Sequence, residues 1–182
     1  MEISVAAQPG AHPVTTAWVD EALARARAAG QPLGALIGRP LAPGDGIALV
    51  GWADPAPGRY HLFETYPGPS AGPATYMQVV EFAGPRTGEW VAAEERAATG
   101  RLRPATEGID GTVSVLRMRA ADNAYLVVVL AEYMEAFDLA GQAIMSTELL
   151  PGEDPEFLGG PDRMSIYRLV HADLPVPEGS QR

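Results

Sequence analysis

The sequence predicts an α+β fold in which a strand, a helix, two strands, a helix and a strand follow one another in the second half of the chain. The first half repeats this order less completely. Two observations support the prediction. Short apolar segments are separated by Gly- and Pro-rich breaks, as strands and turns require. Trp-Val pairs recur at Trp18-Val19 and Trp90-Val91, each near the start of a segment with helical spacing.

In the first half, apolar periodicity and turn residues define the expected elements. The helix has apolar residues at i, i+3 and i+4 spacing and ends at a glycine, and an Asp-Gly turn joins the two strands that follow it. In order, we expect a strand over residues 2–7, a helix from Thr15 or Thr16 to about 29, strands over 33–41 and 47–53, and a segment 59–66 that fits a short helix or a strand equally well.

The second half shows the complete order, which is the ferredoxin-like arrangement. An extra loop around residues 101–107 accounts for its greater length. We expect strands over 75–83, 112–120, 124–131 and 164–172, with helices over 88–99 and from 132 to about 147. The expected division is an N-terminal repeat over 1–66, a Pro-rich linker over 67–73, a C-terminal repeat over 74–174 and a disordered tail over 175–182, and whether the first repeat is complete stays open.

The strand expected over 124–131 is apolar at both alternating sets of positions, so both of its faces must be buried. Helices cover one face of a ferredoxin-like sheet. The other face needs a second sheet, which either the first repeat or a second copy of the chain supplies. We therefore expect two sheets packed face to face, and the choice between a monomer and a homodimer stays open.

The amino-acid composition disfavours several classes of function. The 13 basic residues are all Arg, and 23 acidic residues bring the formal net charge to −10. This charge disfavours binding to nucleic acids and to anionic membrane surfaces. Without Lys there is no Schiff-base lysine or phosphate-loop lysine, and without Cys there is no thiolate nucleophile or zinc-thiolate site. With no signal-peptide pattern and no apolar run long enough to span a bilayer, we expect a cytoplasmic protein.

Three short motifs resemble the dimeric α/β-barrel superfamily, and within it the group similar to antibiotic biosynthesis monooxygenases (ABM-like). They are Gln31-Pro32-Leu33-Gly34-Ala35, the strand end and helix start over residues 47–56, and Ala131-Glu132-Tyr133-Met134-Glu135-Ala136-Phe137. The resemblance covers most of the chain as two tandem copies. The first copy departs from the family pattern, because Pro55 and Pro57 interrupt its second helix and no clean fourth strand follows.

The resemblance implies a pocket between sheet and helices, where cofactor-free members oxygenate aromatic polyketide phenols. We therefore expect a cofactor-independent enzyme of secondary metabolism that oxygenates, cyclises or isomerises an aromatic small molecule, with dioxygen as co-substrate and no metal. Two alternatives stay open: a non-catalytic ligand-binding or oligomerisation protein, and a haem-binding member of the same superfamily that would use His61 or His171.

The candidate site residues follow from chemistry at the expected strand ends and helix faces. His61 is the candidate proton acceptor, because a neutral imidazole can take a phenolic proton near pH 7. Against this, His61 could be an exposed loop residue, the Trp residues could be plain core, and Arg117 and Arg119 could form salt bridges to carboxylates. The candidate substrate-binding residues are Trp52 and Trp90 as stacking walls, Tyr76, Gln78 and Arg117 as orienting groups, and Tyr125 and Tyr167 as polar lining.

Overall fold

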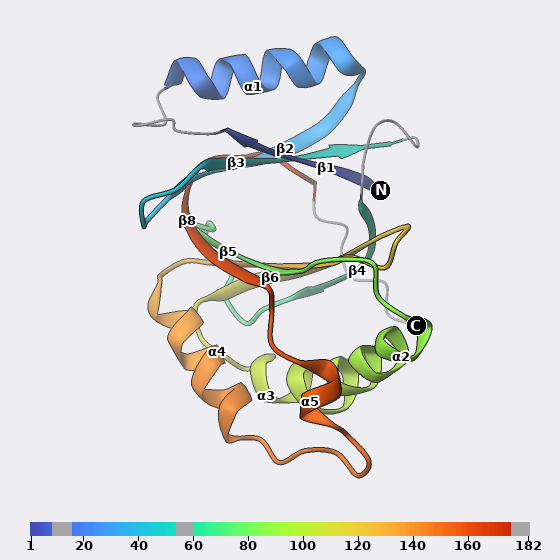
Figure 1. Cartoon of the computed structure of the whole chain (residues 1–182). Helices are drawn as coiled ribbons and strands as arrows, with labels where there is room; N and C mark the ends of the chain where they lie inside the picture. Colours follow the sequence, from blue (N-terminus) through green and yellow to red (C-terminus); the bar gives the residue numbers. More distant parts are fainter. Residues whose placement is uncertain (9–15, 54–59, 176–182) are drawn as a thin grey trace.

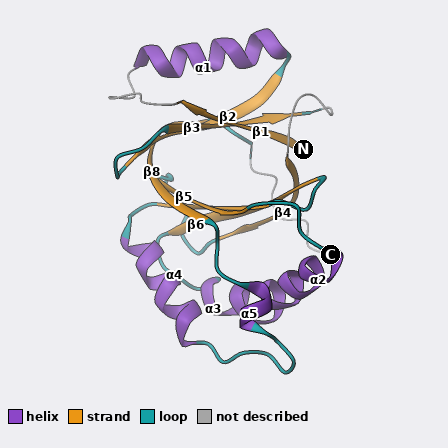
Figure 2. Ribbon diagram, viewed as in Figure 1, coloured by secondary structure: helices purple, strands orange, loops and turns teal. Residues whose placement is uncertain are grey.

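The structure is a computed structural model in which residues 1–8, 16–53 and 60–175 are described. Within these ranges the strands form a closed antiparallel barrel with helices on two opposite sides (Figures 1 and 2). The strand order around the barrel is β1-β3-β2-β8-β5-β7-β6-β4. The strands are β1 (Glu2–Gln8), β2 (Pro32–Pro40), β3 (Gly46–Trp52), β4 (Tyr60–Pro67), β5 (Tyr76–Phe82), β6 (Thr112–Ala120), β7 (Tyr125–Ala131) and β8 (Arg163–Ala172). The helices are α1 (Thr16–Ala29), α2 (Gly88–Ala97), the π-helix η1 (Ala98–Leu102), α3 (Arg103–Thr106), α4 (Glu135–Ser146) and α5 (Pro155–Leu158).

Each half of the chain pairs its four strands in the same order. In the first half β1 lies between β3 and β4, with β2 on the far side of β3. In the second half β5 lies between β7 and β8, with β6 on the far side of β7. The pairs β2–β8 and β4–β6 join the two half-sheets and close the barrel. This confirms the predicted α+β fold of ferredoxin-like units packed as a barrel, while the exact repeat boundaries stay a prediction.

The segment whose sequence fits a helix or a strand equally well forms strand β4. It pairs with β1 on one side and β6 on the other, so it is the strand that closes one seam. The first half therefore does have a fourth strand, which corrects the expectation drawn from its sequence. A register shift between Leu62 and Glu64 interrupts the alternation of β4, which explains why the period could not be assigned from the sequence.

The barrel interior is apolar and is built by both halves. Ile3, Leu49, Met77, Leu116 and Val128 are almost completely buried there. Along β7, alternate residues face this interior, so its inner face is covered as predicted. The other residues lie on the helix side, where Tyr125 and Ala131 are buried but Val127 and Val129 are only half-buried, so the outer face is covered in part. The opposing sheet comes from the first half of the same chain.

Helix α1 lies alone on one side of the barrel, and α2 to α5 lie on the opposite side (Figure 1). Trp18 on α1 packs with Ile37 and Trp52 on the outer face of the first half-sheet. On the other side, α2 begins at Thr87, whose hydroxyl oxygen accepts a hydrogen bond from the Trp90 amide at 3.2 Å. The buried face of α2 carries Trp90, Glu94 and Ala97.

The segment expected as an extra loop around residues 101–107 is helical instead. The π-helix η1 and the short helix α3 continue directly from α2, and Pro104 lies in the first turn of α3. Arg101 then pairs with Glu153, which anchors the connection that leads to α5 and β8. Pro104 and Gly100 indicated a break in the sequence, but both residues are accommodated within helical turns.

The Pro-rich linker forms regular contacts with the second half. The amides of Gly68 and Ser70 donate hydrogen bonds to the carbonyls of Val113 and Thr112, at 2.9 and 3.0 Å. Residues 54–56 of the family-like motif, the neighbouring Pro57 and the tail beyond Pro175 lie outside the described residues. In the described part of the chain, no helix is both long and apolar enough to cross a membrane.

The barrel core provides a test of the fold. Met77 is 0% exposed in the barrel interior, whereas Met145 on α4 is 85% exposed. We expect Met77→Ala to lower the free energy of unfolding by about 2–5 kcal/mol, because it leaves a cavity in a closed core. Met145→Ala, the same chemical change at the surface, should alter it by less than about 0.5 kcal/mol. Urea denaturation measures both, and equal effects of the two substitutions would contradict this core.

Candidate functional site

The outer face of the second half-sheet, which β4 extends, collects side chains from five strands. Residues directly opposite each other in neighbouring antiparallel strands point to the same face, so the strand registers define rows across the sheet. Arg117 lies opposite Glu64 on one side and Val127 on the other. The complete row, from β4 to β8, is Glu64, Arg117, Val127, Val80 and Met164.

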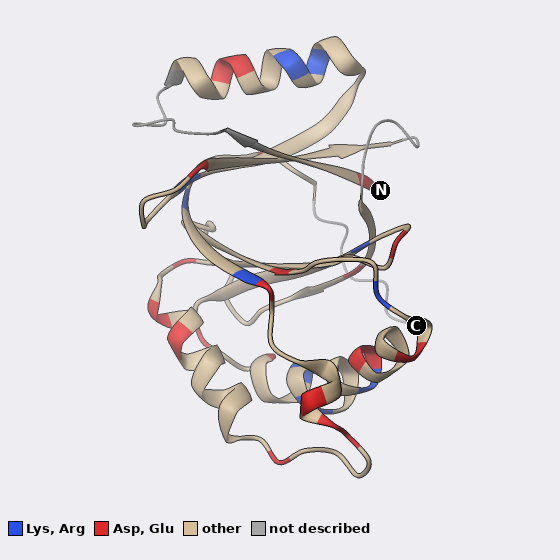
Figure 3. Ribbon diagram, in the orientation of Figure 1, with Lys and Arg blue, Asp and Glu red and all other residues tan. Residues whose placement is uncertain are grey.

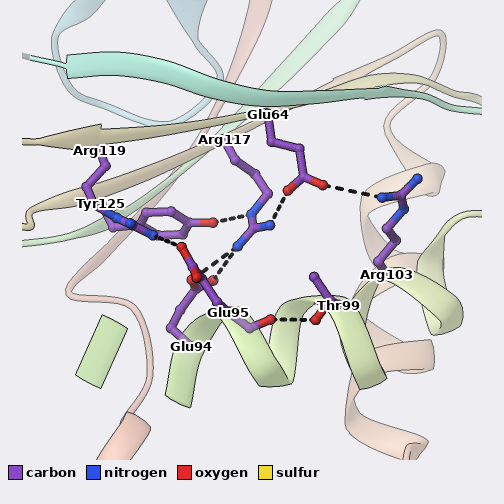
Figure 4. Close-up of polar contacts among 8 residues, drawn as sticks. All are labelled: Glu64, Glu94, Glu95, Thr99, Arg103, Arg117, Arg119 and Tyr125. Carbon is purple, nitrogen blue, oxygen red and sulfur yellow. Dashed lines mark hydrogen bonds and ion pairs between the residues drawn. The ribbon is translucent and has the colours of Figure 1, made fainter. Parts of the chain in front are cut away.

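Arg117 is the centre of a buried polar cluster beneath α2 (Figure 4). Only 5% of this residue is exposed. Its Nη1 donates to a carboxylate oxygen of Glu64, and its Nη2 lies 3.1 Å from Oε2 of Glu94. Its Nε donates to the hydroxyl oxygen of Tyr125. One guanidinium thus links two strands to the helix that covers them.

A second set of ion pairs surrounds this cluster. Arg103 on α3 lies 3.3 Å from Glu64, and Arg119 on β6 lies 2.7 Å from Glu95 (Figure 4). Across the molecule, acidic residues also occur on α4, α5 and the loops beside them (Figure 3). Because these outer pairs are more exposed than the Arg117 contacts, each contributes little to stability.

Burial controls the electrostatics of Glu94. The residue is 9% exposed, and this burial raises the pKa of its carboxyl, an effect that Arg117 and the Tyr125 hydroxyl partly offset. Burial likewise raises the pKa of Tyr125, and the Glu94 charge adds to that rise. The phenol therefore stays protonated, while the Glu94 carboxyl is placed to exchange a proton closer to neutral pH than an exposed glutamate.

Aromatic rings enclose the Tyr125 end of the cluster. The ring centroids of Phe63, Phe82 and Trp90 lie 6.0, 5.9 and 6.4 Å from that of Tyr125. The Arg117 guanidinium lies 5.2 Å from the Phe63 ring centroid, within cation–π range. These rings exclude water from one side of the ion pairs and leave the other side facing the apolar part of the same row.

That apolar part is accessible. Val127 and Val80 are half-buried and Met164 is exposed, although all three lie in the row that begins at Glu64 and Arg117. The neighbouring row continues the surface with Val129, Gln78 and Ile166. An accessible apolar surface next to a buried carboxylate, guanidinium and phenol can bind a flat apolar molecule and exchange a proton with it.

The structure brings three predicted residues, Trp90, Arg117 and Tyr125, together in this site. Tyr76 and Gln78 lie on the same outer face, farther from the cluster, and Gln78 Nε2 lies 3.2 Å from Met164 Sδ. The salt bridges weighed for Arg117 and Arg119 both form.

The other three predicted residues lie elsewhere or face solvent. His61 is the register partner of Arg119, but its side chain is 59% exposed and its Nδ1 lies 2.8 Å from a Glu2 carboxylate oxygen. Trp52 packs against α1, and its indole N–H donates to the Ser4 hydroxyl at 3.1 Å. Tyr167 faces the barrel interior.

Two central residues, Glu94 and Glu64, did not stand out in the sequence. Glu94 is four residues after Trp90, so it shares the buried face of α2, and an acid at an apolar helix position was a detectable signal. Glu64 follows the register shift in β4, which the sequence alone does not reveal. A cavity of about 220 Å³ lies inside one mouth of the barrel, and another of about 410 Å³ is lined by the loop over residues 40–45, by β8 and by Met134.

The described residues offer little for a metal or for axial haem ligation. No group of three or more acidic or histidine side chains among them is placed to hold a metal ion. His61 and His171 each lie within 3 Å of a carboxylate, of Glu2 and Asp173 respectively. In each imidazole, one of the two ring nitrogens therefore lies next to a carboxylate.

Comparison with known proteins identifies the fold. No family model and no curated protein matches the chain. The heme-degrading enzyme LmHde from Listeria monocytogenes is 12% identical with a TM-score of 0.54, over 92% of this chain and 99% of that one. Proteins provisionally named monooxygenases from Fusobacterium nucleatum (9% identical, TM-score 0.59, 92% and 91% covered) and Lactobacillus acidophilus (12%, 0.52, 93% and 93%) are also similar. At such identities the likeness shows the fold, and it agrees with the ABM-like barrel that the sequence resembles.

The raised pKa of Glu94 predicts a specific pH dependence. The folded protein holds this proton more tightly than the unfolded chain, so the stability that Glu94 contributes is present below its ordinary pKa of 4.5 and is lost as the pH rises through the raised value. We expect the unfolding free energy of the wild type minus that of Glu94→Gln to fall over this window, by about 1.4 kcal/mol for each tenfold gain in proton affinity. Denaturation at a series of pH values measures it.

Glu95→Gln is the matched control, because the neighbouring Glu95 carboxylate is about half exposed and pairs with Arg119. Its difference from the wild type gives the baseline for the same substitution in an exposed ion pair. If the unfolding free energy of the wild type minus that of Glu94→Gln instead rises with pH, the pairing with Arg117 outweighs the burial of the Glu94 carboxyl, and the raised pKa is contradicted.

Proposed function

We propose that this protein is a cofactor-independent enzyme that oxygenates an aromatic, polyketide-type small molecule on the outer face of its second half-sheet. The buried contact of Glu94 and Tyr125 with Arg117, next to an accessible apolar surface, is the observation that carries this proposal. The fold shared with proteins named as monooxygenases supports the reaction class. Cyclisation or isomerisation at the same site would use the same proton transfer.

The proposed chemistry begins with a phenol or its keto tautomer lying on Val127 and Val80. The Glu94 carboxylate accepts the acidic proton, which leaves an electron-rich anion that the Arg117 guanidinium stabilises. The anion passes one electron to dioxygen, and the two radicals combine into a hydroperoxide that takes up a proton. Loss of water from this hydroperoxide gives the quinone. Trp90 and the surrounding rings keep bulk water away from the anion.

In this assignment Glu94 takes the role first considered for His61. A buried carboxyl with a raised pKa, in contact with Arg117 and Tyr125, is better placed to deprotonate an apolar substrate than an exposed imidazole paired with Glu2. Gln78 and Tyr76 remain proposed substrate-orienting groups farther along the face. Trp52 and Tyr167 are not part of this proposed site.

One observation favours a second candidate, a non-catalytic binding protein. The guanidinium of Arg117 is already satisfied by two carboxylates and a hydroxyl, as in a purely structural ion-pair network. In that case the cluster would fix α2 on the sheet, and the apolar face would bind a ligand without turnover. Measurement of turnover separates the two candidates.

Oxygen uptake with a panel of anthrols tests the proposal. We expect the wild type to consume dioxygen and form the quinone, and Glu94→Gln to lower kcat by about 100-fold or more, as for loss of a general base. Glu95→Gln, the control on the same helix, should retain activity within about twofold. Circular dichroism and thermal melts establish that each variant is folded.

The activities of the variants and the binding measurements distinguish the candidate proton acceptors and the candidate functions. A large loss in His61→Ala with full activity in Glu94→Gln would return the proton acceptor to His61. No oxygen uptake with any anthrol would rule out the oxygenase, and binding without turnover would favour the non-catalytic candidate. A Soret band on titration with haemin would instead indicate the haem-binding alternative.

A further inference from the structure

The cavity of about 220 Å³ lies at one mouth of the barrel, on the inner face of the sheet. Its walls include Val79 from β5, Leu126 from β7, and the rings of Tyr60 from β4 and Tyr167 from β8. Both halves of the chain therefore build it. Along β5 and β7 its wall residues alternate with Val80 and Val127, which belong to the proposed catalytic face, so the two places lie on opposite faces of the same strands.

Three charged residues border this apolar cavity: Asp45 and Glu81 are acidic and Arg163 is basic. Glu81 and Arg163 both line it, and they are directly opposite each other in the β5–β8 pair. Their Cβ atoms are therefore about 5 Å apart, as for any such pair. No hydrogen bond or ion pair joins either side chain to another residue in the described part of the chain. By contrast, Arg117 and Arg119 on the outer face are paired with carboxylates.

We propose that the barrel mouth binds a small zwitterion with an apolar side chain, the chemistry of a free aromatic or branched α-amino acid. The Arg163 guanidinium suits the ligand carboxylate, which it can hold through two parallel hydrogen bonds. The Glu81 carboxylate suits the ammonium group, and the neighbouring apolar and aromatic walls take the side chain.

Charge and size both select this class of ligand. A protein with a formal net charge of −10 repels a simple anion, whereas a zwitterion carries no net charge. A volume of about 220 Å³ is below the range of cavities that hold drug-sized ligands, and it accommodates one aromatic ring with a short polar head. A lone amine would leave Arg163 without a partner, and a lone carboxylate would leave Glu81 without one.

Calorimetry and methyl NMR with L-phenylalanine test this site. We compare it with 3-phenylpropionate, which lacks the ammonium group, and phenethylamine, which lacks the carboxylate. L-phenylalanine should bind at least tenfold more tightly than either and should shift the methyl signals of Val79 and Leu126. The mapping uses the wild type, so it does not depend on whether a variant folds.

Variants then identify the groups that hold the head. Glu81→Gln and Arg163→Gln should each weaken L-phenylalanine binding at least tenfold, whereas Glu21→Gln and Arg25→Gln, which remove an exposed ion pair on α1, should not change it. Glu94→Gln should bind normally, which separates this inference from the proposed oxygenase. Absence of binding by both L-phenylalanine and L-leucine, equal affinity for the amine or acid analogue, or binding indifferent to Glu81→Gln and Arg163→Gln would overturn it.

Discussion

The structure depends on removing the apolar inner faces of both half-sheets from water within a single chain. The inward residues of β7 are apolar and buried, and no helix among the described residues lies on the inner side of either half-sheet. Closure through the β2–β8 and β4–β6 seams satisfies both halves at once. It also abolishes the free sheet edges that a lone ferredoxin-like unit presents. A homodimer is therefore not required to bury the inner faces.

Closure has a second consequence, because it gives β5, β6 and β7 two different environments. Their inner residues form the barrel core and the mouth cavity, whereas their outer residues meet α2. Under α2, the carboxylate of Glu94 gives up its hydration and recovers only part of that free energy from Arg117 and Tyr125. Such an arrangement contributes little to stability, since an apolar core of equal volume would do as well. It does produce a proton acceptor with a raised pKa beside an apolar surface, which is the combination that acid–base chemistry on an aromatic substrate needs.

Local patterns in the sequence predicted most of the fold. Apolar periodicity identified the helices α1, α2 and α4 and most strands, and the two apolar faces of β7 required a second sheet. The helical continuation through η1 and α3 was missed, because Gly100 and Pro104 normally mark a break in a helix. Strand β4 was ambiguous because a register shift interrupts its alternation.

The site was only partly predictable for a related reason. Arg117, Trp90 and Tyr125 stood out by residue type and position, and they do meet. Which face each strand residue takes depends on registers between distant strands, so the inward direction of Tyr167 and the contact of Trp52 with α1 could not be derived from the sequence. The exposure of His61 follows from the pairing of β4 with β1 and β6 at a seam that joins the two halves.

The central claim is that Glu94 is a buried carboxyl with an elevated proton affinity beneath α2. Carbon-13 NMR titration of the Glu94 side-chain carboxyl, assigned by its disappearance in Glu94→Gln, measures this directly. We expect a midpoint clearly above the ordinary value of 4.5. A midpoint at or below that value would mean that the Arg117 ion pair dominates and that Glu94 is a structural partner instead of a proton acceptor.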